Sequence, residues 1–254
     1  MSAWLDPLRA ALDGATKPIT VFVRDDDAGW ADARLLTLLD LFAAHEAPID
    51  LAVIPTELRP GLAAELRSRH AASGGRLGLH QHGYCHANHQ PEGRKCEFGP
   101  ARSFDAQRRD IAEGRRLLHA QLGDALDPIF TPPWNRCTAD TGAALADLGV
   151  AVLSRDSTAE LLGITGLGEL VVQVDWLAAR RGERLSRAAL GALLAERAAG
   201  PAPLGVMLHH AVMDEAECDG VAELLGVLAG HPNTEMCSMA RIVRTTNLRK
   251  GETS

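Results

Sequence analysis

The densest group of potential metal ligands in this sequence lies in residues 77–89, LGLHQHGYCHANH, which hold four of the ten histidines in a chain of 254 residues. His82 and His86 are four positions apart, so one turn of helix or a tight loop can aim both imidazoles at one cation. Imidazole suits zinc and its neighbours, and the clustering predicts that these two histidines bind a metal ion. His80 and His89 are expected to support the site or face a substrate, with a purely structural role as the open alternative.

Three adjacent carboxylates form a second candidate cluster, in the segment RDDDAG at residues 24–29. In an ordinary protein such a run is a solvated turn, because neighbouring carboxylates repel one another. Here the run follows an apolar segment, and a cation would offset the repulsion. One aspartate would complete a set of two histidines and one carboxylate with open positions for water and substrate, and its neighbour would be available as a base.

Short apolar segments alternate with amphipathic ones along the chain, as expected of strands and helices in turn. Strands are predicted at residues 19–23, 49–54, 76–80, 127–130, 150–154, 170–174, 204–208 and, as a further candidate, 234–239. Helices are predicted at residues 32–45, 60–71, 103–122, 139–148, 185–198 and 214–229, with Ser103 and Asp214 as helix caps. This order predicts parallel β–α units, and a length of about 250 residues fits a closed α/β barrel better than an open sheet.

Unusual polar residues follow five of these strands at their C-terminal ends. They are Asp25, Asp26 and Asp27 after the first strand, the histidine cluster after the third, Thr131 to Trp134 after the fourth, Asp175 and Trp176 after the sixth, and His209 and His210 after the seventh. The C-terminal ends of parallel strands meet on one face of an α/β fold, where active sites form. The five groups are therefore predicted to form one site, with the irregular segment 88–103 as a long loop over the barrel mouth.

Composition is that of an ordinary globular protein, predicted here to be one domain over residues 1–254, with 46% hydrophobic and 23% charged residues. The net charge of −7 and the scattered Lys and Arg residues argue against a nucleic-acid partner. Five widely spaced cysteines without a C-x-x-C pair predict free thiols and not a disulfide framework or a zinc ribbon. The N-terminal segment has no secretion-signal pattern and no apolar stretch reaches the roughly 18 residues of a membrane span, so a cytoplasmic location is expected.

Five of these motifs together resemble those of a known enzyme family. Asp26-Asp27, His82-x-x-x-His86, Pro133-Trp134, Asp175-Trp176 and Leu208-His209 occur in the order and rough spacing of the motifs of the polysaccharide deacetylases, the NodB-homology carbohydrate esterases. The resemblance covers about residues 19–240. It implies a distorted (β/α)7 barrel and the metal-dependent removal of an acetyl group from an N-acetylated sugar, here a small or lipid-linked saccharide because a cytoplasmic location is expected.

Carried over residue by residue, the resemblance implies a role for each member of the site. Asp26 corresponds to the general base, Asp27, His82 and His86 to the ligands of one divalent ion, His209 to the general acid, and Asp175 to the residue that tunes the catalytic pair. The expected ion is Zn²⁺, with Co²⁺ or another transition metal as alternatives. Because side chains alternate along a strand, only one of His209 and His210 can face the barrel axis, and the motif favours His209.

The sequence departs from the family pattern at two positions. The third motif usually begins with an arginine that orients the base, whereas Thr131 stands here, so Arg24 or Arg136 is expected to hold Asp26 instead. The first motif reads RDDDAG in place of TFDDG, which leaves the register among the three aspartates open by one residue. In the favoured register Asp25 points away from the site, and its replacement is expected to matter least.

A group of residues around this centre is assigned to substrate binding: Arg24, His89, Pro133, Trp134, Trp176 and His210. The two tryptophans would form walls of a sugar pocket, with packing at the barrel mouth as the alternative for each. In the loop 88–103, Arg94, Lys95 and Arg102 could meet an anionic substrate group, with an ordinary solvated loop as the alternative.

Three other functions share most of these residues. A metal-dependent hydrolase of a different amide or ester would need the same set. An Fe(II) oxygenase would use two histidines and one carboxylate but would need neither the spare aspartate nor the distal histidine. A barrel that binds sugar without turnover would not need the proton-transfer groups. Metal analysis together with acetate release from N-acetyl sugars distinguishes these functions.

Overall fold

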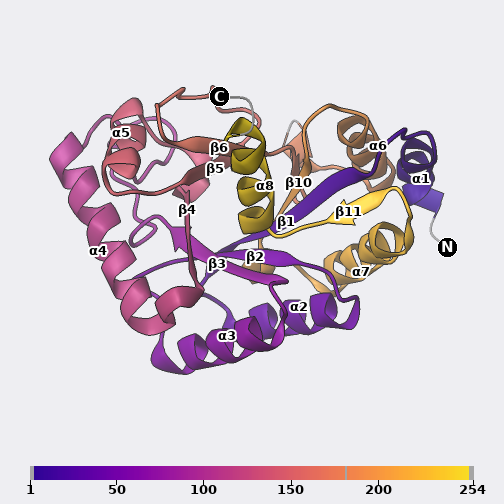
Figure 1. Ribbon diagram of the computed structural model, residues 1–254, viewed down its shortest axis with the longest axis horizontal. Coiled ribbons are helices and arrows are strands. Elements are labelled where there is room, and N and C mark those ends of the chain that lie inside the picture. The colour runs from indigo at the N-terminus through magenta and orange to yellow at the C-terminus, as the bar shows by residue number, and fades with distance from the viewer. Residues whose placement is uncertain (1–2, 181, 252–254) are drawn as a thin grey trace.

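The computed structural model describes residues 3–180 and 182–251 and is built around a nine-stranded sheet whose strand pairs are parallel (Figure 1). Its strands are β1 (Ile19–Ala28), β2 (Ile49–Val53), β3 (Leu77–His82), β4 (Leu126–Thr131), β5 (Val152–Asp156), β6 (Gly168–Val172), β7 (Val174–Asp175), β10 (Leu204–Leu208) and β11 (Thr234–Met236). The helices are α1 (Asp6–Asp13), α2 (Asp32–Ala44), α3 (Pro60–Ala72), α4 (Phe104–Leu122), α5 (Ala139–Asp147), α6 (Arg187–Ala198), α7 (Glu215–Gly230) and α8 (Met239–Gly251). Strands β8 (Ala179–Arg180) and β9 (Glu183–Arg184) form a separate antiparallel pair.

One stretch of chain brings the two edges of this sheet together. β6 lies at one edge, where it pairs with β5, and β7 lies at the other edge, where it pairs with β10. Only Gln173 separates β6 from β7, so both edges belong to one nearly continuous strand that changes partner. The amide of Gln173 donates to Gly205 O at 2.9 Å, and its side-chain oxygen accepts from Gly205 N at 2.6 Å. With β6 and β7 counted as one strand and β11 outside the circle, the sheet forms a nearly closed seven-stranded barrel, which confirms the predicted (β/α)7 fold.

The side chains of β1 show how the barrel is filled. Phe22 lies in an apolar cluster with residues of β4, β5, β6 and β10, whereas Val21 and Val23 belong to the larger cluster between the sheet and the helices. Because side chains alternate along a strand, Arg24 and Asp26 share the inner face with Phe22. The inner face of β1 therefore changes from apolar at its start to charged at its end, which places the polar groups at the C-terminal mouth.

Helix α8 covers the opposite end of the barrel (Figure 1). Met239 and Ile242 of this helix pack in the same cluster as Phe22. The backbone N–H of Met239 donates to Oδ2 of Asp50, a buried residue near the start of β2, at 2.9 Å. The N-terminal end of the barrel is thus filled with apolar side chains and covered by a helix.

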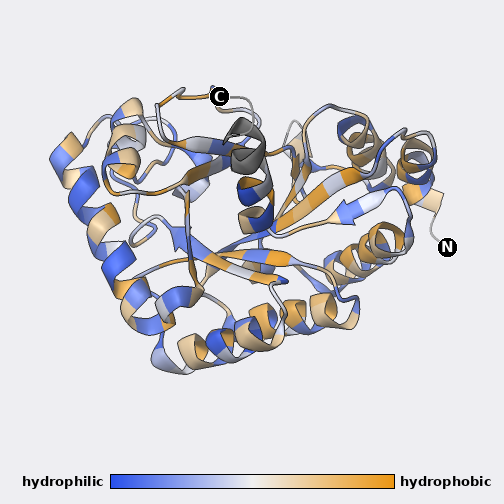
Figure 2. Ribbon diagram, in the orientation of Figure 1, coloured by the Kyte–Doolittle hydropathy of each residue, from blue (hydrophilic) through white to orange (hydrophobic). Residues whose placement is uncertain are grey.

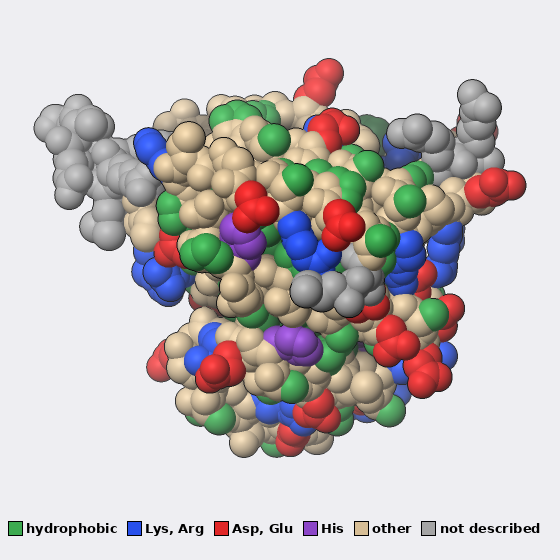
Figure 3. Space-filling view, turned by 90° about the vertical axis from the view of Figure 1, so that its right-hand side faces the viewer, with side chains coloured by type: hydrophobic (Ala, Val, Ile, Leu, Met, Phe, Trp, Pro, Cys, Tyr) green, Lys and Arg blue, Asp and Glu red, His purple; other side chains and the backbone are tan. Residues whose placement is uncertain are grey.

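The remaining helices pack apolar faces against the sheet and present polar residues outward, as the colouring in Figure 2 shows. On the side of the molecule that carries α1 and α7, Figure 3 shows acidic and basic side chains interspersed, without a large area of one sign among the described residues. Within the part of the chain that the structure describes, none of the helices combines the length and the apolar character needed to cross a membrane.

Most elements agree with the sequence-based prediction to within a few residues. Ser103 and Asp214 cap α4 and α7 as predicted, each accepting a hydrogen bond from a backbone amide of the first turn. The sequence pattern does not predict α1 or α8, because α1 is short and α8 is largely polar. Within the predicted strand 234–239, only β11 forms, and it pairs with the start of β1.

Candidate active site

The inner side chains at the end of β1 form a buried ion pair. Arg24 Nε donates to Asp26 Oδ1 at 2.8 Å and Arg24 Nη2 donates to Asp26 Oδ2 at 2.9 Å, a bidentate geometry that fixes the plane of the carboxylate. Arg24 is fully buried and Asp26 is 2% exposed. Burial raises the pKa of Asp26, but the charges of Arg24, His82 and His209 together outweigh this effect, with Arg24 contributing most, and hold the pKa below the usual range of a carboxyl. Asp26 is therefore ionised at neutral pH.

Arg24 also joins β1 to two distant parts of the chain. Its Nη1 donates to Ser154 Oγ of β5 at 2.8 Å, and its Nη2 donates to Asn135 Oδ1 in the turn after β4 at 2.7 Å. A guanidinium with this many fixed partners has little freedom to move, so it holds Asp26 in one orientation. The sequence pattern points to neither Ser154 nor Asn135, because both contacts depend on the closed barrel.

The structure shows which arginine holds Asp26 in the absence of an arginine at position 131. Thr131 Oγ1 lies 2.9 Å from His80 Nε2, and burial lowers the pKa of His80 to about 3, so this histidine is a neutral structural residue. Arg136 donates to a backbone carbonyl of the loop 88–103. Of the two arginines considered from the sequence, Arg24 makes the contact with Asp26 and Arg136 does not.

A backbone irregularity brings Asp27 to the same site as Asp26. Adjacent side chains of a regular strand face opposite sides. The pairing of β1 with β2, however, shifts register between Asp25 and Ala28, and Asp27 has a left-handed φ of 71°. A bulge of this kind turns a side chain away from the direction that the regular pleat would give it. The carboxylate of Asp27 thereby reaches the histidine cluster at the end of β3.

Asp27, His82 and His86 form a cluster of three metal-ligating side chains. Asp27 Oδ1 lies 3.1 Å from the Nε2 atoms of both histidines, and the three donor atoms lie within 4.8 Å of one another. Ligands bound at about 2.1 Å to a tetrahedral or octahedral ion lie roughly 3.0–3.4 Å apart, so donor types and separations fit a metal ion. His82 Nδ1 lies 3.1 Å from Thr131 O, which fixes the ring and leaves Nε2 to face the cluster. Burial raises the pKa of Asp27, but contacts with both histidines hold it well below the usual range.

A buried carboxylate stabilises the turn that carries His86. Glu97 is fully buried, and its oxygens accept from Cys85 N at 2.8 Å and from Tyr84 N at 3.2 Å. Gly83 and His86 have left-handed φ values of 55° and 54°. A Cβ on Gly83 would overlap Glu97 Oε2, so glycine is needed for this close approach. Glu97 therefore determines the path of the backbone that leads to His86.

Cys85, His89 and Glu97 form a second group with donor atoms within 4.8 Å of one another. The carboxylate of Glu97 already accepts from two backbone amides and from Cys85 Sγ at 3.3 Å. Burial raises the pKa of Cys85 to about 11, and a protonated thiol is a poor metal ligand. His89 is exposed and lies in this group, outside the Asp27 cluster.

The two histidines after β10 have different surroundings. His209 Nε2 lies 4.0 Å from Asp26 Oδ2, at the barrel mouth. His210 is buried, with Nδ1 2.6 Å from Asp25 Oδ2 and Nε2 2.7 Å from Trp30 O. Its backbone N–H also donates to Asp25 Oδ1 at 2.9 Å. His210 and Asp25 therefore stabilise the barrel wall together, and the structure does not place His210 against a substrate, contrary to the assignment made from the sequence.

Comparison with known proteins identifies the fold. No protein-family model matches the sequence, and no curated protein sequence does. Among solved structures, the chain is similar to a provisionally assigned polysaccharide deacetylase from Mycobacterium smegmatis, with a TM-score of 0.66, 16% identity and coverage of 92% of each chain. A family 4 acetyl xylan esterase from Clostridium thermocellum in complex with a cobalt ion matches with a TM-score of 0.60 and 14% identity, over 90% of this chain and 92% of that chain. This chain has the polysaccharide deacetylase fold.

The polysaccharide deacetylase fold occurs in proteins with and without activity. A family 4 carbohydrate esterase from Streptomyces lividans in complex with acetate matches with a TM-score of 0.55 and 14% identity, over 87% of this chain and 91% of that chain. A family 4 pseudoenzyme from Bacillus anthracis matches with a TM-score of 0.58 and 12% identity, over 90% of this chain and 66% of that chain. The fold therefore leaves activity to be decided by the residues at the barrel mouth.

Two tryptophans flank His86 at this mouth of the polysaccharide deacetylase fold. The ring centroid of Trp134 lies 4.5 Å from that of His86, and the centroid of Trp30 lies 4.8 Å from it, both in edge-on contacts. Trp134 has a left-handed φ of 57° and follows the buried Pro133. The sequence analysis identifies Trp134 and Pro133 but misses Trp30, although its place three residues after Asp27 was an available signal.

Trp176 lies in the core and does not line the mouth. Its side chain is 4% exposed and packs edge-on against Trp4, with ring centroids 6.2 Å apart. The guanidinium carbon of Arg187 lies 4.9 Å from the ring centroid of Trp176. Of the two tryptophans assigned to a sugar pocket, Trp134 is at the site, and Trp176 packs in the core against Trp4 and Arg187, the first residue of α6.

Asp175 lies near His209 but faces a backbone amide. Burial raises the pKa of the Asp175 carboxyl, whereas the nearby His209 lowers it. Its Oδ1 accepts from Leu177 N at 2.9 Å. Asp175 is thus placed to influence His209 through its charge, and the tuning role assigned to it stays a prediction.

Proposed function

We propose that this protein is a metal-dependent carbohydrate deacetylase that removes the acetyl group from an N-acetylated saccharide or glycolipid. The proposal depends on one observation, the convergence of three groups at the barrel mouth. These groups are the ion-paired carboxylate of Asp26, the cluster of two histidines and one carboxylate, and the imidazole of His209. Hydrolysis of an amide needs a proton acceptor for water, a Lewis acid for the carbonyl and a proton donor for the leaving amine.

Asp27, His82 and His86 are the residues that would hold the metal ion, with zinc as the expected ion and cobalt as the alternative. When bound, the ion supplies the Lewis acid that lowers the pKa of water and polarises the acyl carbonyl. The protein's own contribution is to fix the three donor atoms. The bulge at Asp27 and the turn held by Glu97 do this from two different strands.

Asp26 is suited to accept the proton of the attacking water. Arg24 keeps its carboxylate ionised and fixed in orientation, and each carboxylate oxygen retains a lone pair beyond the one that Arg24 uses. A carboxyl with a lowered pKa also gives up its proton readily once the proton has been accepted. Asp26 can therefore act as the base and then be regenerated in the same turnover.

His209 is suited to protonate the leaving amine. Its Nε2 faces Asp26 Oδ2 at 4.0 Å, and its side chain is 25% exposed, so a substrate can reach it from the mouth. Trp30 and Trp134 flank His86 and offer rigid apolar surfaces on which a sugar ring can pack.

An acetyl ester is the second candidate substrate. The similar structure from Clostridium thermocellum is named an acetyl xylan esterase. The same proposed base, metal-binding residues and acid would also cleave an ester. The hydroxyl group of a sugar, which leaves when an acetyl ester is cleaved, needs less help from an acid than a leaving amine does. Dependence of the rate on His209 therefore distinguishes the two substrates.

Acetate release from a panel of N-acetylated and O-acetylated saccharides and glycolipids tests the proposal. The protein is stripped of metal with a chelator and then reloaded with zinc or cobalt. We expect activity on at least one N-acetylated substrate that is lost on chelation and restored by metal. Activity that survives complete removal of metal, or acetate released from esters alone, would contradict the proposal.

Two aspartate variants separate metal binding from proton transfer. Asp27→Asn should lower metal content and activity together, because a neutral amide replaces an anionic ligand. Asp26→Asn should keep the metal and lose about 100-fold or more in kcat, because only the proton acceptor is lost. Asp124→Asn, an exposed residue before β4, is the matched control. Loss of metal in Asp26→Asn with retention in Asp27→Asn would show that the two roles are exchanged.

A further inference from the structure

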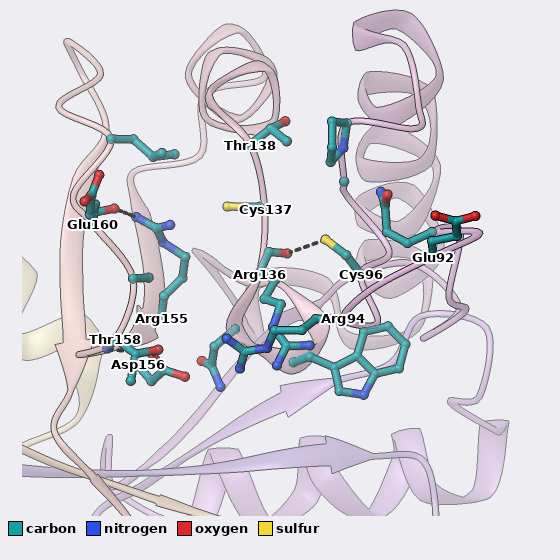
Figure 4. Close-up of a pocket in the computed structure, with 17 residues that line it drawn as sticks. Glu92, Arg94, Cys96, Arg136, Cys137, Thr138, Arg155, Asp156, Thr158 and Glu160 are labelled. Atoms are coloured by element: carbon teal, nitrogen blue, oxygen red, sulfur yellow. Dashed lines mark hydrogen bonds between the residues drawn. The ribbon is translucent and has the colours of Figure 1, made fainter.

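An open pocket adjoins the candidate active site. It has a volume of about 560 Å³ and lies between the loop 88–103, the turn after β4 and the segment 155–162 (Figure 4). Trp134 and Asn135 are part of its lining. Trp134 packs edge-on against His86 with centroids 4.5 Å apart, and Asn135 accepts from Arg24, the partner of Asp26. A substrate bound at the barrel mouth can therefore extend directly into this pocket.

Three cations lie near Trp134: Arg94 and Arg136 line the pocket with it, and Lys95 lies beside the pocket, over the indole ring. Lys95 Nζ lies 6.0 Å from the centroid of the indole ring, and Arg136 Nη1 donates to Lys95 O at 2.7 Å. Burial lowers the pKa of Arg136, the charge of Arg94 lowers it further, and the charge of Asp156 opposes this lowering. Figure 4 shows Arg94 and Arg136 side by side in the pocket.

None of these three cations forms an ion pair with a carboxylate of the described residues. Among the side chains that the structure describes, no carboxylate oxygen lies within 4.0 Å of the charged nitrogens of Arg94, Lys95 or Arg136. Clustered like charges repel one another, and the charge of Asp156 offsets only part of this repulsion at Arg136. An anion bound among the three cations would reduce it further.

Other charged residues near this pocket have protein partners. Arg155 donates to Glu169 Oε2 and to Glu160 O at 2.7 Å each. Asp156 Oδ1 accepts from both the amide and the hydroxyl of Thr158. Glu92 and Glu160 also line the pocket, and Figure 4 shows their carboxylates on opposite sides of it, away from the pair of arginines.

Arg102 differs from the other two cations of the loop. Its Nη2 lies 2.7 Å from Asp110 Oδ2 and also donates to Ala106 O, so its charge is balanced within the protein. The sequence analysis groups Arg102 with Arg94 and Lys95, whereas the structure replaces it in that group with Arg136.

We propose that Arg94, Lys95 and Arg136 bind an anionic group, a carboxylate or a phosphate, that the substrate carries beside its acetylated sugar. The physiological substrate is then an acidic saccharide. Guanidinium groups bind both carboxylate and phosphate oxygens through paired hydrogen bonds. This inference rests on the proposed deacetylase function for the identity of the neighbouring sugar, but the binding of the anion itself does not require catalysis.

Binding and turnover of three related sugars test this inference on the full chain. N-acetylglucosamine is neutral, N-acetylmuramic acid carries a carboxylate, and N-acetylglucosamine 6-phosphate carries a phosphate. Calorimetry should show that at least one acidic sugar binds about 10- to 100-fold more tightly than the neutral sugar, the range expected of charge-assisted hydrogen bonds. The advantage should shrink as salt concentration rises. The carboxylate and phosphate arms show which anion the site prefers.

Variants of the three cations complete the test. The double variant Arg94→Gln/Lys95→Gln and the single variant Arg136→Gln should each remove most of the preference for acidic sugars and leave binding of the neutral sugar unchanged. Arg94 and Lys95 are exposed, so the double variant should fold normally. Arg102→Gln is the matched control on the same loop and should keep the preference.

Four outcomes bear on the inference. Equal binding of acidic and neutral sugars, or no binding of any of them, overturns it. A preference that survives in both variants overturns it as well. Acid-selective binding that the variants abolish supports it even if no acetate is released, in which case the proposed deacetylase function fails while the anion site stands. If acetate is released with equal efficiency from neutral and acidic sugars, the deacetylase function is supported and the anion site is overturned.

Discussion

Asp26 and Asp27 are adjacent in the sequence, yet both reach the barrel mouth because β1 bulges at Asp27. Asp26 follows the regular pleat and meets Arg24 inside the barrel. Asp27 leaves the pleat through a left-handed φ and meets the two histidines from β3. One strand thus supplies both a buried candidate base and a partly buried candidate ligand, which a regular strand cannot do with neighbouring residues.

Arg24 should control the protonation of Asp26. Burial alone raises the pKa of this carboxyl, and Arg24 supplies the main opposing charge. We expect Arg24→Met to raise the pKa of Asp26, so the acid limb of the kcat/KM profile moves to higher pH. Arg24→Lys, which keeps the charge but loses the bidentate contact, should move it less. Acetate release measured across pH tests this, with Arg108→Met at a surface ion pair as the control. An acid limb that stays in place in Arg24→Met would contradict Asp26 as the base.

The Asp25–His210 pair predicts a pH-dependent contribution to stability. Burial lowers the pKa of His210, but the charge and hydrogen bond of Asp25, together with the Trp30 carbonyl and the charge of Asp27, outweigh this and raise it from 6.5 to about 9. The pair therefore stabilises the fold fully below pH 6.5, and this stabilisation is lost as pH rises towards 9. Asp25→Asn should lower the free energy of unfolding by about 1–3 kcal/mol at low pH, with a smaller difference at high pH.

Denaturant unfolding of the wild type and Asp25→Asn at about pH 6 and about pH 9 measures this difference. An equal loss at both pH values would show that the imidazole does not change its charge between them, contrary to this prediction. From the sequence, replacement of Asp25 is expected to have the smallest effect of the three aspartates because its side chain points away from the site. The structure agrees with this orientation of the side chain but not with a small effect on stability. Its side chain does point away from the group formed by Asp27, His82 and His86, but it is fully buried and paired with His210.

At the scale of elements, the turn after β3 depends on the loop that follows it. Glu97 lies in the loop 88–103 and accepts from two amides just before His86. Glu97→Gln replaces one accepting oxygen with a donor that faces an amide, so we expect the turn to shift. Metal affinity should fall about 10- to 100-fold, the usual cost of losing support around a ligand.

Competition with a chelator measures this affinity, and the absorption spectrum of the cobalt form reports the ligand geometry. Glu92→Gln, an exposed glutamate of the same loop, is the control. Unchanged affinity and spectrum in Glu97→Gln would show that the turn holds its shape without this carboxylate.

At the scale of the whole molecule, the two ends of the barrel have different roles. The C-terminal mouth carries the candidate site, and the N-terminal end is covered by α8 (Figure 1). Burial at this covered end raises the pKa of Asp50 to about 8, although the amide of Met239 partly opposes the effect. Asp50 Oδ1 has no hydrogen-bond partner. An ionised carboxylate there destabilises the fold.

Asp50→Asn should therefore stabilise the protein. The unfolded carboxyl ionises near 3.8 and the folded one at about 8, so the wild type loses stability as pH rises between these values. The advantage of Asp50→Asn should grow over that range and level off above it. Thermal unfolding across pH measures the effect, with Asp124→Asn again as the control. A variant less stable than the wild type at pH 8 would contradict this account.

The sequence by itself determined the barrel and the position of its active end. Alternation of apolar and amphipathic segments predicts parallel strands, and polar residues at strand ends predict the mouth, because both patterns are local and repeat with the period of the element. The same reasoning, with the resemblance to the deacetylase motifs, selected Asp26, Asp27, His82, His86 and His209, which the structure brings together.

Only the tertiary structure decided which partners these residues have. Arg24 contacts Ser154, 130 positions away, and Trp176 packs against Trp4, although it follows a strand that leads to the mouth. Such contacts depend on closure of the barrel, on the bulge in β1 and on the packing of helices around the sheet. These features result from many weak interactions between distant segments, and periodicity along the chain carries no record of them.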